Sequence, residues 1–160
     1  MWQAVVKSLN DMNEAYKELI PLLDKKHDLL VEVKMSDLEA LLKEETKLTT
    51  KIAKLEKERR EVFTQLAAKE ESVRPDMKLA EVIAVAPTSL RGALAKIHAE
   101  LKEISEQAKN KSEINSVLAT GALDAVNVRL NKIGKAAVSP TYGNGGTQQV
   151  THEKKFDFNA

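Results

Sequence analysis

The three histidines are the side chains best suited to bind a metal or to act as a general base: His27, His98 and His152. No two of them are four residues apart, and His98 lacks the second histidine and the glutamate of an HExxH zinc motif. The absence of cysteine excludes disulfides, thiolate metal ligands and cysteine nucleophiles. We therefore interpret the histidines as exposed or rim residues of helices, and we expect no metal or other cofactor.

Carboxylates are abundant, but they alternate with lysines at helical spacing, as in Lys54/Glu58 and Lys57/Glu61. This spacing is typical of exposed helix faces, where each pair contributes only about 0.2–0.5 kcal/mol. No Glu-x-x-His pair indicates a di-iron bundle. The glycine-rich stretch at 142–146 precedes no helix and lacks the Gly-Lys-Ser/Thr of a phosphate loop. The sequence therefore predicts that the protein is not an enzyme.

The composition is typical of long helices, with 31% charged and only 4% aromatic residues in a chain of 160. A net charge of +1, with neither sign concentrated in any long block, argues against nucleic acid as a partner. The N-terminus has an acidic residue by Asp11 and no apolar core, so we expect no signal peptide. No stretch is apolar enough for a membrane span. These features predict a cytoplasmic protein.

Residues 2–33 carry apolar side chains at alternating steps of three and four, which is the spacing of a coiled-coil seam. Pro21 lies within this stretch, and a proline inside a helix costs about 3 kcal/mol. Because the seam stays in phase across Pro21, the pattern predicts one kinked helix instead of two. Nine of the ten seam residues are apolar or aromatic: Trp2, Val5, Leu9, Met12, Tyr16, Leu19, Leu23, Lys26, Leu30 and Val33.

A second seam follows a short break and predicts a helix that ends before Pro75. Ser36 and Glu39 have the spacing of a capping box at its start. The short connection requires the two helices to form an antiparallel hairpin. Glu45 and Arg59 interrupt the seam, either as seam-edge side chains or in ion pairs between neighbouring helices. Seven of the nine seam residues are apolar: Leu38, Leu41, Glu45, Leu48, Ile52, Leu55, Arg59, Val62 and Leu66.

A short helix is predicted near 77–85, and a long third helix begins after Pro87. Its seam runs to Ala108, is interrupted at 109–112 and resumes in another phase from Ile114. Asn115 is either a buried residue that fixes register or the cap of a helix restarted after a hinge at 109–113. Further on, small residues replace leucine in the seam and apolar residues spread around the helix. Such a surface suits a helix that accepts another partner.

Residues 136–160 contain proline, glycine, serine, threonine and glutamine, and too little apolar surface to become ordered. We therefore divide the chain into a helical bundle at 1–135 and a flexible tail at 136–160. The expected fold class is all-α. Its architecture is an elongated antiparallel three-helix coiled-coil bundle, made of a long helical hairpin and a long C-terminal helix.

Several local motifs occur in an order that can be compared with known families. They are the turn VEVKMSDLEAL at 31–41, the second-helix end LEKERR at 55–60, and Asn115-x-x-Leu118-x-x-x-x-Leu123 with Leu130. The tail adds PTYG at 140–143 and FDFNA at 156–160. Together with the length, they resemble FlgN-type flagellar export chaperones over essentially the whole chain, with a tail similar to versions from Gram-positive bacteria. One departure is that Gly121 and Ala122 stand where bulkier residues are expected.

The resemblance implies a cytosolic chaperone of the flagellar type III export system. Its partners would be the C-terminal helical segments of hook-associated (hook–filament junction) proteins, kept from premature assembly and delivered to the export gate cytoplasmic domain. A helix-in-groove complex would bury such a helix reversibly. By resemblance, Tyr142 is the candidate export-gate contact. We place the groove on seven residues: Ile114, Val117, Leu118, Leu123, Val126, Leu130 and Ile133.

Other interpretations stay open at this point. The groove residues could instead pack into the core against the first two helices, and Tyr142 could be an isolated aromatic residue of the tail. The helices could build a structural homo-oligomeric coiled coil, or a regulator that sequesters a signalling or transcription factor. For a chaperone we expect a monomer or weak dimer when free.

Overall fold

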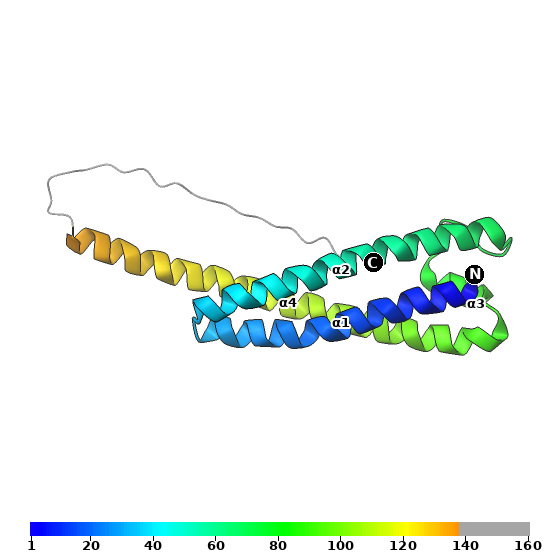
Figure 1. Ribbon diagram of the computed structural model, residues 1–160, viewed down its shortest axis with the longest axis horizontal. Helices are drawn as coiled ribbons and strands as arrows, with labels where there is room; N and C mark the ends of the chain where they lie inside the picture. Colours follow the sequence, from blue (N-terminus) through cyan, green and yellow to red (C-terminus); the bar gives the residue numbers. More distant parts are fainter. Residues whose placement is uncertain (138–160) are drawn as a thin grey trace.

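The computed structural model describes residues 1–137 and contains four helices and no strand in this part of the chain. They are α1 (Trp2–Val31), α2 (Met35–Lys69), α3 (Leu79–Val85) and α4 (Thr88–Ala137). Three long helices lie side by side in an elongated bundle, as Figure 1 shows. The predicted all-α fold, a long hairpin plus a long third helix, is confirmed. Most of the predicted tail, residues 138–160, lies outside the described residues.

Helix α1 is the common partner of the other two long helices. It runs antiparallel to α2, with ion pairs from Lys51 to Glu18 and from Lys26 to Glu45. It runs parallel to α4, because Asn13 bonds Glu100 and Asp24 pairs with Lys111, each pair 87 residues apart in sequence. The backbones of α2 and α4 do not approach each other closely. The described residues therefore form two helix pairs that share α1.

The first seam predicts the core of α1 well. Eight of its ten residues are buried, and Lys26 instead forms a partly buried ion pair with Glu45 at 2.9 Å. Pro21 is exposed within a single helix, so the prediction of one helix across it is confirmed. On α2 the same regularity buries Leu41, Leu48, Ile52 and Leu66.

The hairpin turn between α1 and α2 is built by backbone hydrogen bonds. The Lys34 amide donates to the Leu29 carbonyl, and the Val33 amide donates to the Leu30 carbonyl. This is a Schellman turn, and its left-handed position is occupied by Val33 with φ of 55°. The left-handed conformation costs a non-glycine residue about 1–2 kcal/mol, and branching at Cβ makes valine unusual there. The turn is therefore a site of local backbone strain.

The predicted capping box at Ser36 and Glu39 is wrong. Helix α2 begins two residues earlier, at Met35, with Lys34 as the N-cap and no side-chain cap hydrogen bond. The reason is the Schellman turn, which brings Lys34 directly to the cap position, where its carbonyl accepts from the Leu38 amide at 3.0 Å. Ser36 is left inside the first turn of the helix.

At the opposite end of the bundle, α2 ends at Lys69, before Pro75 as predicted, and the short α3 packs against α4. Arg59 forms an ion pair with Glu56 of its own helix and lies 5.5 Å from the centre of the Phe63 ring. The expected ion pair between neighbouring helices is therefore found for Glu45 and not for Arg59.

Helix α4 is one continuous helix of 50 residues, without a break at 109–113. Its buried residues facing α1 recur every seven residues: Leu94, Leu101, Ala108 and Asn115. The predicted change of phase after Ala108 is therefore wrong. The seam continues unshifted, and it looked interrupted only because polar residues, Lys111 and Asn115, occupy two of its positions.

Candidate functional site

Helix α4 extends further along the bundle than α1, the helix that covers it. The α1–α4 register of 87 residues places Val31, the last residue of α1, level with Leu118. Helix α4 continues to Ala137, which is 19 residues further and about 28 Å at 1.5 Å per residue. In Figure 1 this part of α4 projects beyond the α1–α2 hairpin. We call residues 118–137 the distal segment of α4.

Asn115 marks the end of the covered part of α4. Its side chain is 2% exposed, and its Nδ2 donates to the Leu23 carbonyl at 2.9 Å. Next to it, Lys111 pairs with Asp24 of α1. A buried side chain that must bond a particular carbonyl of α1 fixes the register of the two helices. Of the two interpretations of Asn115, a register-fixing residue and a helix cap, the structure supports the first.

The exposed apolar residues of α4 fall into two stripes, about 120° apart around the helix axis at 100° per residue. One begins with Leu118 and Ala122 on the side of α4 that faces α1 and turns gradually away from that side toward Leu130, and we call it the seam face. It consists of Leu118, Ala122, Val126, Leu130 and Ile133. The other, which we call the outer face, consists of Ile114, Val117, Gly121, Ala125 and Val128.

The structure therefore divides the seven predicted groove residues. Four share the seam face, where Leu118 and Val126 are half-buried and Leu130 and Ile133 are 59% and 65% exposed. Ile114 and Val117 lie on the outer face, and Leu123 lies at the edge of the seam face, about 20° around the helix axis from Leu130. A single flat groove holding all seven is thus not present. The alternative of core packing is excluded for the five exposed residues: Ile114, Val117, Leu123, Leu130 and Ile133.

The far end of the distal segment is basic. After Asp124 it carries Arg129, Lys132 and Lys135 and no acidic residue. No ion pair involves these three side chains among the residues that the structure describes. The distal segment thus combines an uncovered apolar stripe with a positive end.

A comparison with protein-family models gives one family. The model described as FlgN protein matches residues 1–149, which is most of the chain. The chain belongs to the FlgN family. Comparisons with curated proteins and with solved structures found no match. Membership implies a role as a flagellar export chaperone, and this is a family of chaperones and not of enzymes.

The FlgN match extends across the distal segment and the position of Tyr142. Tyr142 itself lies outside the described residues, so its role stays a prediction. No helix in the described part is long and apolar enough to cross a membrane. Nor does any group of three or more metal-binding side chains gather between residues 1 and 137.

Sequence reasoning missed a second exposed apolar patch, at the hairpin that α1 and α2 form in this FlgN-family chain. Val31, Val33 and Met35 are 58%, 52% and 48% exposed there. The heptad pattern of the sequence places only Val33 of these three in a seam. The sequence does hold a sign of this patch: Val31, Val33 and Met35 alternate with charged residues across the turn. We call these three residues the hairpin tip.

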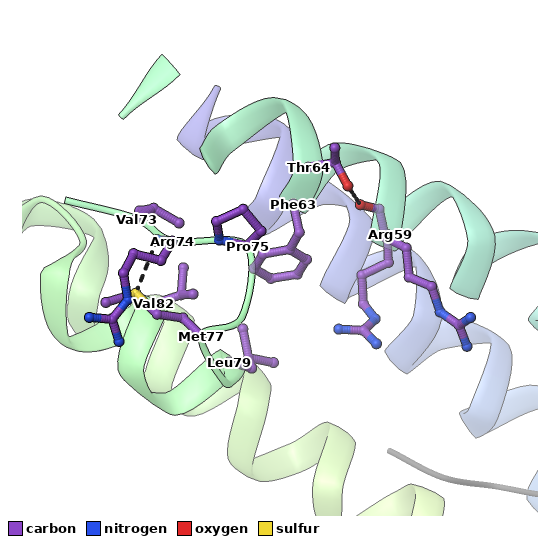
Figure 2. Close-up of a pocket in the computed structure, with 10 residues that line it drawn as sticks. Arg59, Phe63, Thr64, Val73, Arg74, Pro75, Met77, Leu79 and Val82 are labelled. Carbon is purple, nitrogen blue, oxygen red and sulfur yellow. Dashed lines mark hydrogen bonds between the residues drawn. The ribbon is translucent and has the colours of Figure 1, made fainter. Parts of the chain in front are cut away.

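A cavity of about 210 Å³ lies at the opposite end, between α2, α3 and the loop that joins them. Figure 2 shows Phe63, Pro75, Met77 and Leu79 lining it beside arginine side chains. Arg59 and Arg60 both pair with Glu56, and Arg74 pairs with Asp76. No histidine or carboxylate lines the cavity. It is therefore better explained as a junction of helix ends than as a catalytic pocket.

At this end of the bundle, the surroundings of Glu56 change the pKa of its carboxyl group. Partial burial by itself raises its pKa. Hydrogen bonds and positive charge from Arg59 and Arg60 together outweigh that effect and hold the pKa of Glu56 below its ordinary value. The carboxylate therefore stays ionised at neutral pH and serves as an anchor for two arginines.

Proposed function

We propose that the protein is a cytoplasmic flagellar export chaperone that binds the C-terminal helical segments of hook-associated (hook–filament junction) proteins on the seam face of the distal segment. In this proposal it keeps those segments from assembling and delivers them to the cytoplasmic domain of the export gate. One observation carries the proposal. Helix α4 continues for 19 residues beyond the level at which α1 ends, and this part of it carries large apolar side chains that the bundle leaves exposed.

A helix in this position needs a second helix to cover it. An isolated helix of about 12–15 residues is marginal in water, and an amphipathic face is normally stabilised by packing. Leu130 and Ile133 are mostly exposed in the free chain, and burying such a side chain contributes about 1.5–3 kcal/mol. A partner helix that covers the seam face would continue the line of α1. It would thereby complete the bundle.

The same chemistry explains why the binding would be reversible. The seam face contains Ala122 beside larger residues, so its apolar area is modest. Association also costs several kcal/mol of lost translational and rotational freedom. An export substrate must be released at the gate, so a short apolar stripe with exposed ends suits a carrier better than a fully enclosed groove does.

The test is the double substitution Leu130→Asp with Ile133→Asp. Both side chains are exposed, so the bundle should keep its thermal stability while a carboxylate on the seam face prevents apolar contact. Isothermal titration calorimetry with the C-terminal helical segment of a hook–filament junction protein should show at least a 100-fold loss of affinity. The matched control, Asn127→Asp with Asn131→Asp, adds the same charge on the polar side of the helix and should bind normally. Equal affinity in all three proteins would refute the proposal.

Delivery to the export gate is a separate step, and we assign its contact to Tyr142. The family match includes this position, which supports the assignment. Tyr142→Ala should bind the junction-protein segment normally, yet lower secretion of junction proteins in a motility and secretion assay. Tyr142→Phe serves as control, because it keeps the ring. Loss of substrate binding in Tyr142→Ala would instead place the residue in the substrate site.

Self-association is the competing use of the same surface. Light scattering coupled to size-exclusion chromatography should give a monomer or weak dimer for the free protein. It should give a defined complex after the junction-protein segment is added. A stable oligomer that ignores the segment would favour a structural coiled coil.

A further inference from the structure

We propose that the hairpin tip, Val31, Val33 and Met35, is the end wall of the distal site, and that the bound helix runs parallel to α4 with its N-terminus at this tip. The inference rests on the proposed function, because it takes the same partner helix as its occupant. It adds a second contact surface and a direction of binding.

The register places the tip at the start of the uncovered seam. Val31 is level with Leu118, so the apolar tip lies at the level along α4 at which α1 stops covering the helix. A helix lying on Val126, Leu130 and Ile133 would therefore meet the hairpin at one of its ends. Figure 1 shows the hairpin ending alongside α4, with the distal segment continuing past it.

Val33 supplies a reason to regard the tip as a binding surface. Glycine is the usual residue at the left-handed position of a Schellman turn, and valine there is strained. Its side chain is 52% exposed, so it gains little from packing inside the free protein. Strained residues that the free fold does not need are concentrated at binding sites. A bound helix end would give the Val33 side chain the apolar contact that it lacks.

The direction follows from charge. Residues 28–39 at the hairpin carry four carboxylates and one lysine, a net charge of −3: Asp28, Glu32, Asp37 and Glu39 against Lys34. Residues 125–137 carry three basic residues and no acidic one, a net charge of +3: Arg129, Lys132 and Lys135. The dipoles of the α1 C-terminus and the α2 N-terminus have opposite sign at the hairpin and largely cancel. The side chains therefore decide the local field.

A helix has a positive N-terminus and a negative C-terminus. It is favoured with its N-terminus at the acidic hairpin and its C-terminus at the basic end of α4, which is the direction of both α1 and α4. An acidic residue near the C-terminal end of the bound segment would strengthen the preference. The bound helix would then stack end to end on α1.

The absence of cysteine permits a direct test by single spin labels. Ser36→Cys places a nitroxide at the hairpin, and Asn131→Cys places one near the far end; both side chains are exposed and uncharged. The probe is the isotope-labelled C-terminal helical segment of a junction protein. The label at 36 should broaden the N-terminal signals of the segment, and the label at 131 its C-terminal signals. The reverse pattern overturns the direction, and no broadening from 36 overturns the role of the tip.

A segment that does not bind at all would refute the proposed function instead, so the two failures are distinguishable. Two substitutions test the contacts separately. Val33→Gly should raise the melting temperature of the free protein, because it relieves the left-handed valine, and yet weaken binding several-fold. Unchanged affinity in Val33→Gly would show that the tip is not part of the site.

Charge reversal tests the direction in a second way. Lys132→Glu with Lys135→Glu should weaken binding by about two- to five-fold for each charge, and added salt should reduce the difference. Lys96→Glu with Lys102→Glu makes the same change in net charge on the covered part of α4. This control should leave affinity unchanged. Equal losses of affinity in both double variants would indicate a general electrostatic attraction by the net charge and would overturn the proposed direction.

Discussion

The covered and uncovered parts of α4 belong to one continuous helix, yet only the covered part buries its apolar residues against α1. From Leu94 to Asn115 one residue in seven is buried on α1, and from Leu118 to Lys135 every residue is partly or fully exposed. The difference does not lie in α4 itself. It arises because α1 ends at Val31, so the length of one helix decides which part of another is free to bind.

The largest expected effect is the difference in the free energy of unfolding between substituting a leucine of the covered part and substituting one of the uncovered part. Leu94 is fully buried and Leu130 is 59% exposed. Leu94→Ala should lower the free energy of unfolding by about 2–5 kcal/mol, because it leaves a cavity between α1 and α4. Leu130→Ala should change it by less than about 0.5 kcal/mol. Urea denaturation followed by circular dichroism measures both, and similar losses would show that the distal segment is part of the cooperative core.

A smaller effect is expected at the boundary between the two parts. Asn115→Ala removes the hydrogen bond to the Leu23 carbonyl and should cost about 1–2 kcal/mol. Asn127→Ala, an exposed asparagine of the distal segment, is the control and should be close to neutral. Thermal denaturation distinguishes them. If Asn115→Ala is as stable as the parent, the register of α1 and α4 is fixed by apolar packing alone.

The glycines of α4 test whether the two parts unfold together. An added Cβ meets nothing within 4 Å at either Gly92 or Gly121. Gly92→Ala should therefore raise the free energy of unfolding by about 0.5–1 kcal/mol, through lower chain entropy and better helix propensity. Gly121→Ala should instead protect distal amides from hydrogen exchange, with little change in global stability. An equal global gain from both would mean that α4 unfolds as a single unit.

The core of the fold could be predicted from sequence because its seams are regular. The first two helices and their antiparallel pairing follow from heptads of leucine joined by a short turn. The third helix was harder, because two polar residues, Lys111 and Asn115, occupy seam positions. Each is satisfied by a group on α1, Asp24 or the Leu23 carbonyl. Such pairings depend on the register of two helices 87 residues apart, which periodicity along one helix does not reveal.

The candidate site could be predicted only in outline. The spread of apolar residues after Ile114 correctly indicated a surface that the core does not use. It did not separate the seam face from the outer face, because that division depends on where α1 lies. The hairpin tip was missed for a related reason: the left-handed backbone of Val33 is set by the Schellman turn. Charges summed over long blocks also concealed the contrast between the acidic hairpin and the basic end of α4.

The smallest expected effect concerns pH and contrasts a partly buried carboxylate of the bundle with an exposed one of the distal segment. The pKa of Glu56 is lowered in the folded protein, against its own burial, by Arg59 and Arg60. A carboxyl group with a lowered folded pKa contributes stability above its unfolded pKa, about 4.3, and loses it as the pH falls through the folded value. Denaturation between pH 7 and pH 3 should therefore show Glu56→Gln less stable than the parent at neutral pH and converging with it in acid. Asp124→Asn is the control for loss of a carboxylate. A constant difference for Glu56→Gln across this range would mean that the arginines stabilise the bundle by packing and not by charge.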